Sequence, residues 1–151
     1  MKNSFKGKGL YLLLMAVLLV VDQIVKSYLG SFPRGVIIYD IIPNFFNIKV
    51  LINSGIAFGV LSNLSHVFIW LNAFILLSFL VYFLFGLKSS SLYFSFTLII
   101  AGAASNLMDR FIYGGVLDYV NFTFFPTFNL ADSYITIAVF LILKDAIFNK
   151  E

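Results

Sequence analysis

The chain has 151 residues, of which 61% are hydrophobic and 11% charged, and its mean hydropathy is +0.99. Soluble domains carry about 25% charged residues, so the composition excludes an ordinary soluble domain and predicts one membrane domain over residues 1–151. The chain has no cysteine and only one histidine, His66, which excludes disulfides, thiol nucleophiles and metal sites built from Cys or several His. The net charge of +3 comes from scattered basic residues, so no nucleic-acid partner is expected.

Four hydrophobic segments, at about 10–28, 67–87, 92–108 and 128–147, predict four membrane-spanning helices. A helix rises about 1.5 Å per residue and the hydrocarbon core is about 30 Å thick, so roughly 17–25 residues cross it. The basic residues before the first segment are typical of a cleavable export signal, but no small-residue cleavage site follows them. The first segment is therefore interpreted as a retained span.

Two segments are expected outside the spans, at 30–66 and 111–127. Runs of β-branched and aromatic residues at 36–39 and 46–51 predict a small antiparallel sheet in the first of them. The second is expected to be a loop. The predicted fold class is an α-helical integral membrane protein with four transmembrane helices and a small extracytoplasmic sheet or loop region between the first two.

The distribution of basic residues predicts the orientation of the spans. Cytoplasmic loops of membrane proteins carry an excess of Lys and Arg. Six lysines fall on one side if both termini are cytoplasmic: Lys2, Lys6, Lys8, Lys88, Lys144 and Lys150. The segments 30–66 and 111–127 then face the outside.

The ionisable residues gather near the outer rim of the predicted membrane region. They are Asp22 and Lys26 at the end of the first span, Asp109 and Arg110 at the end of the third, Asp118 in the following loop, and Asp132 early in the fourth. Such groups are costly at membrane depth and are candidates for function. Asp22 and Lys26 share a helix face and could simply pair. Asp118 and Asp132 have no basic residue nearby in sequence, and an unpaired surface position remains open for both.

Two carboxyls held close together cannot both ionise easily, so one keeps a proton while the other stays charged. Such a pair can activate water and protonate a leaving amine, as in aspartic proteases. A carboxylate site for Mg²⁺ or Ca²⁺ and a proton- or cation-coupled transporter remain alternatives. A Ser-Lys peptidase is not favoured, because Ser27 points away from the adjacent Lys26 on a helix.

Five motifs then occur in order along the chain: Asp22-Gln23 with Lys26, the segment 53–59 (Asn-Ser-Gly-Ile-Ala-Phe-Gly), the segment 106–110 (Asn-Leu-Met-Asp-Arg), the segment 115–119 (Gly-Val-Leu-Asp-Tyr), and the segment 128–132 (Phe-Asn-Leu-Ala-Asp). With them the chain resembles the bacterial lipoprotein signal peptidases, or type II signal peptidases, over nearly its whole length. The resemblance implies a membrane aspartic endopeptidase without metal or cofactor. The implied substrates are prolipoproteins, cut before a diacylglyceryl-modified cysteine at the outer face of the bacterial cytoplasmic membrane, with membrane lipids as neighbours.

The resemblance also implies a role for particular residues. Asp118 and Asp132 correspond to the catalytic pair. The expected substrate-binding residues are Asn53, Gly55, Asn106, Arg110 and Asn129, and the expected supporting polar groups are Asp22, Lys26 and Asp109. Gly55 and Gly59 are expected to let the segment 53–59 gate the site. Tyr119 stands where the family pattern has Phe, and Ala101 and Ser105 stand where it often has Gly, which predicts less close helix contacts there.

Overall fold

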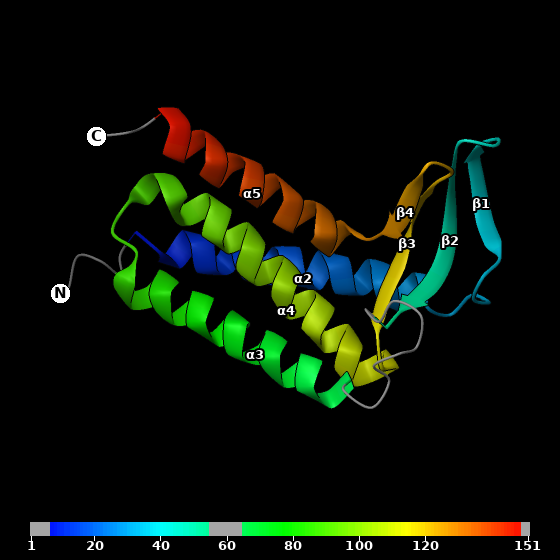
Figure 1. Cartoon of the computed structure of the whole chain (residues 1–151), viewed down its shortest axis with the longest axis horizontal. Helices are drawn as coiled ribbons and strands as arrows, with labels where there is room; N and C mark the ends of the chain where they lie inside the picture. The colour runs from blue at the N-terminus through cyan, green and yellow to red at the C-terminus, as the bar shows by residue number, and fades with distance from the viewer. Residues whose placement is uncertain (1–6, 55–64, 149–151) are drawn as a thin grey trace.

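The computed structural model describes residues 7–54 and 65–148. Within them, helices α2 (Gly9–Leu29), α3 (Ser65–Val81), α4 (Tyr93–Tyr113) and α5 (Leu130–Phe148) form a bundle that carries a β-sheet at one end (Figure 1). A π-helical turn, η3 (Tyr82–Gly86), continues α3, and a 3₁₀ turn, η4 (Ser90–Leu92), leads into α4. The start of α2, the turn between α3 and α4, and the end of α5 all lie at the end opposite the sheet.

The sheet has four antiparallel strands in the order β1 (Ile37–Ile42), β2 (Phe46–Asn53), β3 (Val116–Phe122) and β4 (Phe125–Phe128). The two strands predicted between the first two spans are present. The prediction of a loop over 111–127 is wrong, because β3 and β4 form a hairpin there and β3 pairs with β2. Five of the seven residues of β3 are β-branched, aliphatic or aromatic, and its first four residues are buried, as suits a strand covered by the bundle. Asp118 therefore lies on a strand, opposite Leu51, and not in a loop.

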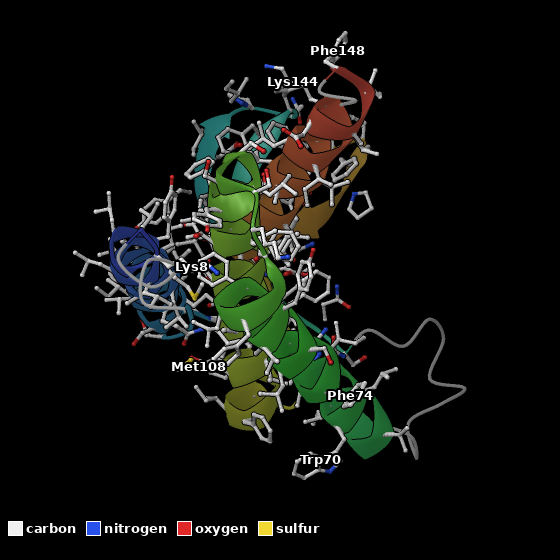
Figure 2. All side chains as sticks on the ribbon, turned by 90° about the vertical axis from the view of Figure 1, so that its left-hand side faces the viewer. Lys8, Trp70, Phe74, Met108, Lys144 and Phe148 are labelled. Atoms are coloured by element: carbon white, nitrogen blue, oxygen red, sulfur yellow. The ribbon has the colours of Figure 1, made fainter. Side chains whose placement is uncertain are left out.

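Three of the helical stretches in the described residues are long and apolar enough to cross a membrane: Gly9–Leu29, Ile69–Gly86 and Ser90–Tyr113. Large apolar side chains point outward from them, as Trp70 and Phe74 do on α3 (Figure 2), where they are 69% and 68% exposed. The chain is thus built to be embedded in a membrane. The fourth predicted span forms α5, but this helix carries Asp132, Lys144 and Asp145, and its crossing stays a prediction.

Helix α4 continues past the end predicted for the third span. Hydropathy falls at Asp109, yet the helix runs to Tyr113, where Gly114 adopts φ of 73° and ends it in the left-handed conformation that glycine favours. Asp109 and Arg110 therefore lie on the last turns of α4. The side chain of Asp109 is fully buried and pairs with Lys26 at 2.7 Å, so its charge is compensated within the bundle.

Helix α4 packs against α2, α3 and α5 and forms the centre of the bundle. It approaches α5 closely at Gly102, where a Cβ atom would lie only 2.6 Å from the carbonyl oxygen of Ala131. The backbones can come this close only because glycine has no side chain. This contact brings the first turn of α5 against the polar end of α4.

Candidate active site

The predicted catalytic pair lies where the sheet meets the ends of α2, α4 and α5. Asp118 is on β3 and Asp132 is in the first turn of α5, and Asn129 links them. Asn129 donates from Nδ2 to Asp118 Oδ1 at 2.8 Å, and its Oδ1 accepts the backbone N–H of Asp132 at 2.9 Å. The connecting segment doubles back, as predicted, because β3 and β4 pair as a hairpin.

Asp132 belongs to a capping box at the start of α5. Asn129 caps the helix with its side chain, while Asp132 Oδ2 accepts the backbone N–H of Asn129 at 3.2 Å. The other oxygen of Asp132, Oδ1, accepts an N–H of Asn106 at 2.7 Å. Both oxygens of this carboxyl are thus held by N–H donors from α4 and from the turn before α5, which fixes its direction.

Asp118 is buried, with only 2% of its surface exposed. Its Oδ2 accepts an N–H of Asn53 at 3.0 Å, and its Oδ1 is bound by Asn129. Burial is the main cause that raises the pKa of Asp118, to about 6; the charge of Asp132 raises it too, while the hydrogen bond from Asn53 opposes the shift most. Asp118 can therefore hold a proton at a pH where an ordinary aspartate has lost it.

A fully buried ion network lies beneath the pair. Lys26 on α2 contacts Asp22 at 2.8 Å and Asp109 at 2.7 Å, and it donates to Asn106 Oδ1 at 2.9 Å. The pairing of Asp22 with Lys26 is the one suggested by their spacing. The contact with Asp109 was missed, because no spacing rule relates residues so far apart in the chain. Asn106 joins this network to Asp132, so the predicted supporting groups and the carboxyl pair form one hydrogen-bonded cluster.

Two further residues of this network were not predicted. Gln23 donates to Ser105 Oγ at 2.8 Å and to Asp109 Oδ1 at 3.0 Å, and Ser105 donates to Asp22 Oδ2 at 2.5 Å. Gln23 stands beside Asp22 in the first motif, which was an available signal. Ser105 was noted only as a departure from glycine, although its hydroxyl replaces an apolar helix contact with a hydrogen bond.

The remaining predicted site residues differ in how they are placed. Arg110 lies on α4, where it donates to the backbone carbonyl of Asn106 at 3.0 Å. It interacts electrostatically with the carboxylates of Asp132, Asp109 and Asp118. Asn53 ends β2 and is exposed. Gly55 and the proposed gate around it, including Gly59, lie outside the described residues.

A pocket of about 460 Å³ reaches Asp132 from the flank of α5. It is lined by Phe125, Phe128, Asp132, Ser133, Thr136 and Ile137. The hydroxyls of Ser133 and Thr136 bind backbone carbonyls of their own helix turn, at 3.2 Å and 2.8 Å. The pocket wall is therefore largely apolar, with one carboxyl, that of Asp132, in its lining.

The chemistry of this cluster rests on carboxyl groups, amides and two cations. Residues 7–54 and 65–148 contain no group of three or more His, Cys, Asp or Glu side chains placed to hold a metal ion. The amides of Asn53, Asn106 and Asn129 orient the two carboxyls without adding charge. A water molecule between such carboxyls would meet both a proton acceptor and a proton donor.

The sequence also matches a known family. The family described as signal peptidase (SPase) II matches residues 14–148. This chain belongs to the signal peptidase II family. A lipoprotein signal peptidase of Thermodesulfovibrio yellowstonii is 37% identical over 131 residues, which cover 83% of this chain and 86% of that protein. One of Staphylococcus aureus is 35% identical over 161 residues, covering 99% and 96%. The resemblance inferred from the five motifs is confirmed.

Solved structures agree with this assignment to the signal peptidase II family. One bacterial membrane enzyme determined by the in meso method has a TM-score of 0.84 and 29% identity, covering 94% of this chain and 95% of its own. A second, described in the same words, has a TM-score of 0.80 and 31% identity, covering 95% and 92%. The membrane-enzyme architecture extends over nearly the whole chain.

Proposed function

We propose that Asp118 and Asp132 are the catalytic pair of a membrane aspartic endopeptidase that cleaves before the diacylglyceryl-modified cysteine of its substrates. Membership of the signal peptidase II family makes the chain an enzyme that removes signal peptides from prolipoproteins. The observation that carries the mechanism is the bridge by Asn129, whose side chain donates to the carboxyl of Asp118 and whose backbone N–H donates to the carboxyl of Asp132. Aspartic catalysis needs two carboxyls that share one proton, and this bridge holds them as a unit.

The path of the protons in the reaction follows from the environments of the two carboxyls. With its pKa raised to about 6, Asp118 holds the shared proton and hydrogen-bonds the scissile carbonyl oxygen. Asp132 takes a proton from water as the water oxygen bonds to the carbonyl carbon. The carbon–nitrogen bond then breaks and the leaving amine takes a proton from the pair. The pair ends the cycle with one proton, as it began.

The asparagines divide into two roles. Asn106 and Asn129 are buried, and their N–H groups bind the two carboxyls. We assign them to positioning, although the resemblance implies substrate contact for both. Asn53 is exposed at the end of β2, and Arg110 is half-buried at the end of α4. These two can reach an extended peptide, so we assign them, with Gly55, to substrate binding.

The flank of α5 suits the lipid part of the substrate. The pocket between β4 and α5 is apolar along most of its wall and includes Asp132 in its lining. An acyl chain that enters it stays in apolar surroundings, as it does in the bilayer, so it reaches the site without the cost of exposing its CH₂ groups to water. We place the acyl chains of the modified cysteine there, beside the bond to be cut.

The bundle supports a four-span topology with both termini in the cytoplasm. The start of α2 and the end of α5 lie at one end of the helices, and the sheet and the carboxyl pair lie at the other (Figure 1). Lys8, Lys88 and Lys144 are at the end with the termini, as the excess of cytoplasmic basic residues requires. The site then faces the outer side of the bacterial cytoplasmic membrane. A cysteine at position 88 that is labelled only from outside would contradict this orientation.

The test is cleavage of a lipidated prolipoprotein by the purified protein in detergent. Asp118→Asn and Asp132→Asn keep the side-chain shape but cannot exchange protons, so each should lower kcat by at least about 10³-fold with folding retained. The double variant should be no slower than either single one, because the two residues act as a unit.

The matched control is Asp40→Asn, the same chemical change at an exposed position on β1. This variant should cleave at the wild-type rate. Substantial cleavage by either folded single variant of the pair would falsify the two-aspartate mechanism.

A further inference from the structure

The backbone N–H groups in the first turn of α5 bind side chains from three parts of the fold. A helix leaves its first N–H groups without partners in its own backbone. Here Leu130 N–H donates to the hydroxyl of Tyr119 at 3.2 Å, Ala131 N–H to Asp22 Oδ1 at 3.2 Å, and Asp132 N–H to Asn129 Oδ1 at 2.9 Å. Strand β3, helix α2 and the turn before α5 each supply one acceptor.

Tyr119 itself is fixed in place by burial. The residue is 5% exposed and packs in the apolar cluster of Leu29, Val50 and Leu117. Burial first, and then the charge of Asp22, raise the pKa of Tyr119, so its hydroxyl keeps the proton. Phe, the residue of the family pattern at this position, offers no acceptor to Leu130. The arrangement therefore goes beyond what the family pattern implies.

Strand β3 thus connects to both carboxyls. Successive side chains of a strand point to opposite faces, so the adjacent Asp118 and Tyr119 project in different directions. Asp118 forms one half of the pair, and Tyr119 binds the helix turn that bears the other half. Asp22, the second acceptor of that turn, is itself bound by Ser105 and Lys26.

We propose that Tyr119 is a positioning residue for cleavage: its hydroxyl, together with the carboxylate of Asp22, fixes the first turn of α5 on β3 and so sets Asp132 opposite Asp118. The proposal rests on the assignment of Asp118 and Asp132 as the catalytic pair. Small displacements of a reacting group have large effects on rate, and a 1 Å error can cost about 100-fold. Loss of one of three contacts on the turn should cost less.

The experiment compares wild type, Tyr119→Phe and Tyr93→Phe in the same prolipoprotein cleavage assay. Tyr119→Phe removes one oxygen and keeps the ring in its cluster. Its kcat per folded enzyme should fall roughly tenfold with KM unchanged, and the amide of Leu130 should exchange hydrogen faster than in wild type. Tyr93 is a buried tyrosine near the opposite end of the bundle, and Tyr93→Phe should leave kcat, KM and Leu130 exchange unchanged.

Each outcome bears on the proposal. An unchanged kcat for Tyr119→Phe, or unchanged exchange at Leu130, overturns it. A rise in KM that accounts for the loss of kcat/KM also overturns it, because the hydroxyl then contacts substrate. A loss of rate that only tracks a smaller folded fraction assigns Tyr119 to stability and overturns a positioning role. If wild type does not cleave the lipidated substrate at all, the proposed function fails, and the positioning role that rests on it fails with it.

Discussion

Two lysines are fully buried at opposite ends of this bundle, and they obtain their partners in different ways. Lys26, at the sheet end, is surrounded by the carboxylates of Asp22 and Asp109 and the amide oxygen of Asn106. Lys8, at the other end, donates to the backbone carbonyls of Phe83, Leu84 and Leu87 at 2.6, 3.1 and 3.0 Å. An ammonium has three N–H donors, and each site provides three acceptors.

The two lysines differ in which parts of the fold their partners connect. The partners of Lys8 all belong to the end of one helical segment, where α3 and η3 present free carbonyls and the negative end of the helix dipole. The rings of Phe83 and Tyr93 lie within 5.6 and 5.2 Å of the ammonium and add a cation–π contribution. Figure 2 shows Lys8 among these helices, seen from their end. This lysine fastens α2 to α3 without involving a carboxylate.

The partners of Lys26 continue into the rest of the site. Asp109 also accepts the backbone N–H of Leu117 on β3, Asp22 accepts that of Ala131 on α5, and Asn106 binds Asp132. A single ammonium therefore stands at the junction of α2, α4, β3 and α5. The comparison predicts that loss of Lys26 affects both folding and cleavage, whereas loss of Lys8 affects folding alone.

The largest effect is expected for Lys26→Met. The variant leaves the carboxylates of Asp22 and Asp109 buried without a cation, a defect of about 3 to 5 kcal/mol. Most of the protein should fail to fold, and any folded fraction should melt far below wild type and cleave poorly. The measurements are the melting temperature and the yield of monodisperse protein in detergent. Lys88→Met, at an exposed position, is the matched control and should behave as wild type. Normal melting of Lys26→Met would contradict the network.

A smaller effect is expected for Lys8→Met. It removes hydrogen bonds to carbonyls that close a helix end, at a cost of roughly 1 to 3 kcal/mol. The melting temperature should fall, while kcat and KM per folded enzyme stay at wild-type values, because no contact of Lys8 continues to the carboxyl pair. Kinetics normalised to folded protein, with Lys88→Met in parallel, separate the two quantities. A change in kcat would show that the two ends are coupled.

The smallest effect is expected for Asn53→Ala, and it is a shift of the pH profile of kcat/KM in a defined direction. The pKa of Asp118 is about 6, raised mainly by burial and also by the charge of Asp132. The hydrogen bond from Asn53 favours the charged form and opposes that rise most, and Asn129 and Lys26 oppose it less. In this mechanism protonated Asp118 is the active form, so kcat/KM falls as pH rises through that pKa. Without Asn53 the proton is held more tightly, and the falling limb should move to higher pH by about half a pH unit.

The measurement is the pH profile of kcat/KM for wild type, Asn53→Ala and Lys8→Met. The profile of Lys8→Met should coincide with that of wild type, because this lysine lies at the opposite end of the bundle. A limb that moves to lower pH in Asn53→Ala would assign the proton to another group.

The sequence allowed the helices to be predicted well, because hydropathy over about 20 residues depends on local composition alone. The pairing of Asp22 with Lys26 followed for the same reason, since it needs only one helix turn. The end of α4 was misplaced because Asp109 lowers hydropathy, although its buried partner Lys26 keeps the helix intact. That partner lies on another helix, and no local pattern encodes it.

From the residues alone a carboxyl pair was one of several open alternatives, and the assignment of Asp118 and Asp132 with their neighbours came from the resemblance. From spacing alone, Asp118 was assigned to a loop, because the segment follows a span and contains Pro126. Its strand pairs with residues 46–53, which are far away in sequence. The positions of Ser105 and Tyr119 show the same limit, since each was visible only as a departure from a pattern. The partner of each hydroxyl lies on another element: Ser105 on α4 binds Asp22 on α2, and Tyr119 on β3 binds Leu130 on α5.

The spacing of Asp22 and Lys26 also bears on the order in which the chain is made. Synthesis proceeds from the N-terminus at about 5–20 residues per second. Asn106, a partner of Lys26, follows it by 80 residues, and Ala131 follows Asp22 by 109 residues. For roughly 5 to 20 s the first span exists without these partners. During that time the contact one helix turn away neutralises both charges, so the span can enter the bilayer as a pair with no net charge before α4 and α5 are made.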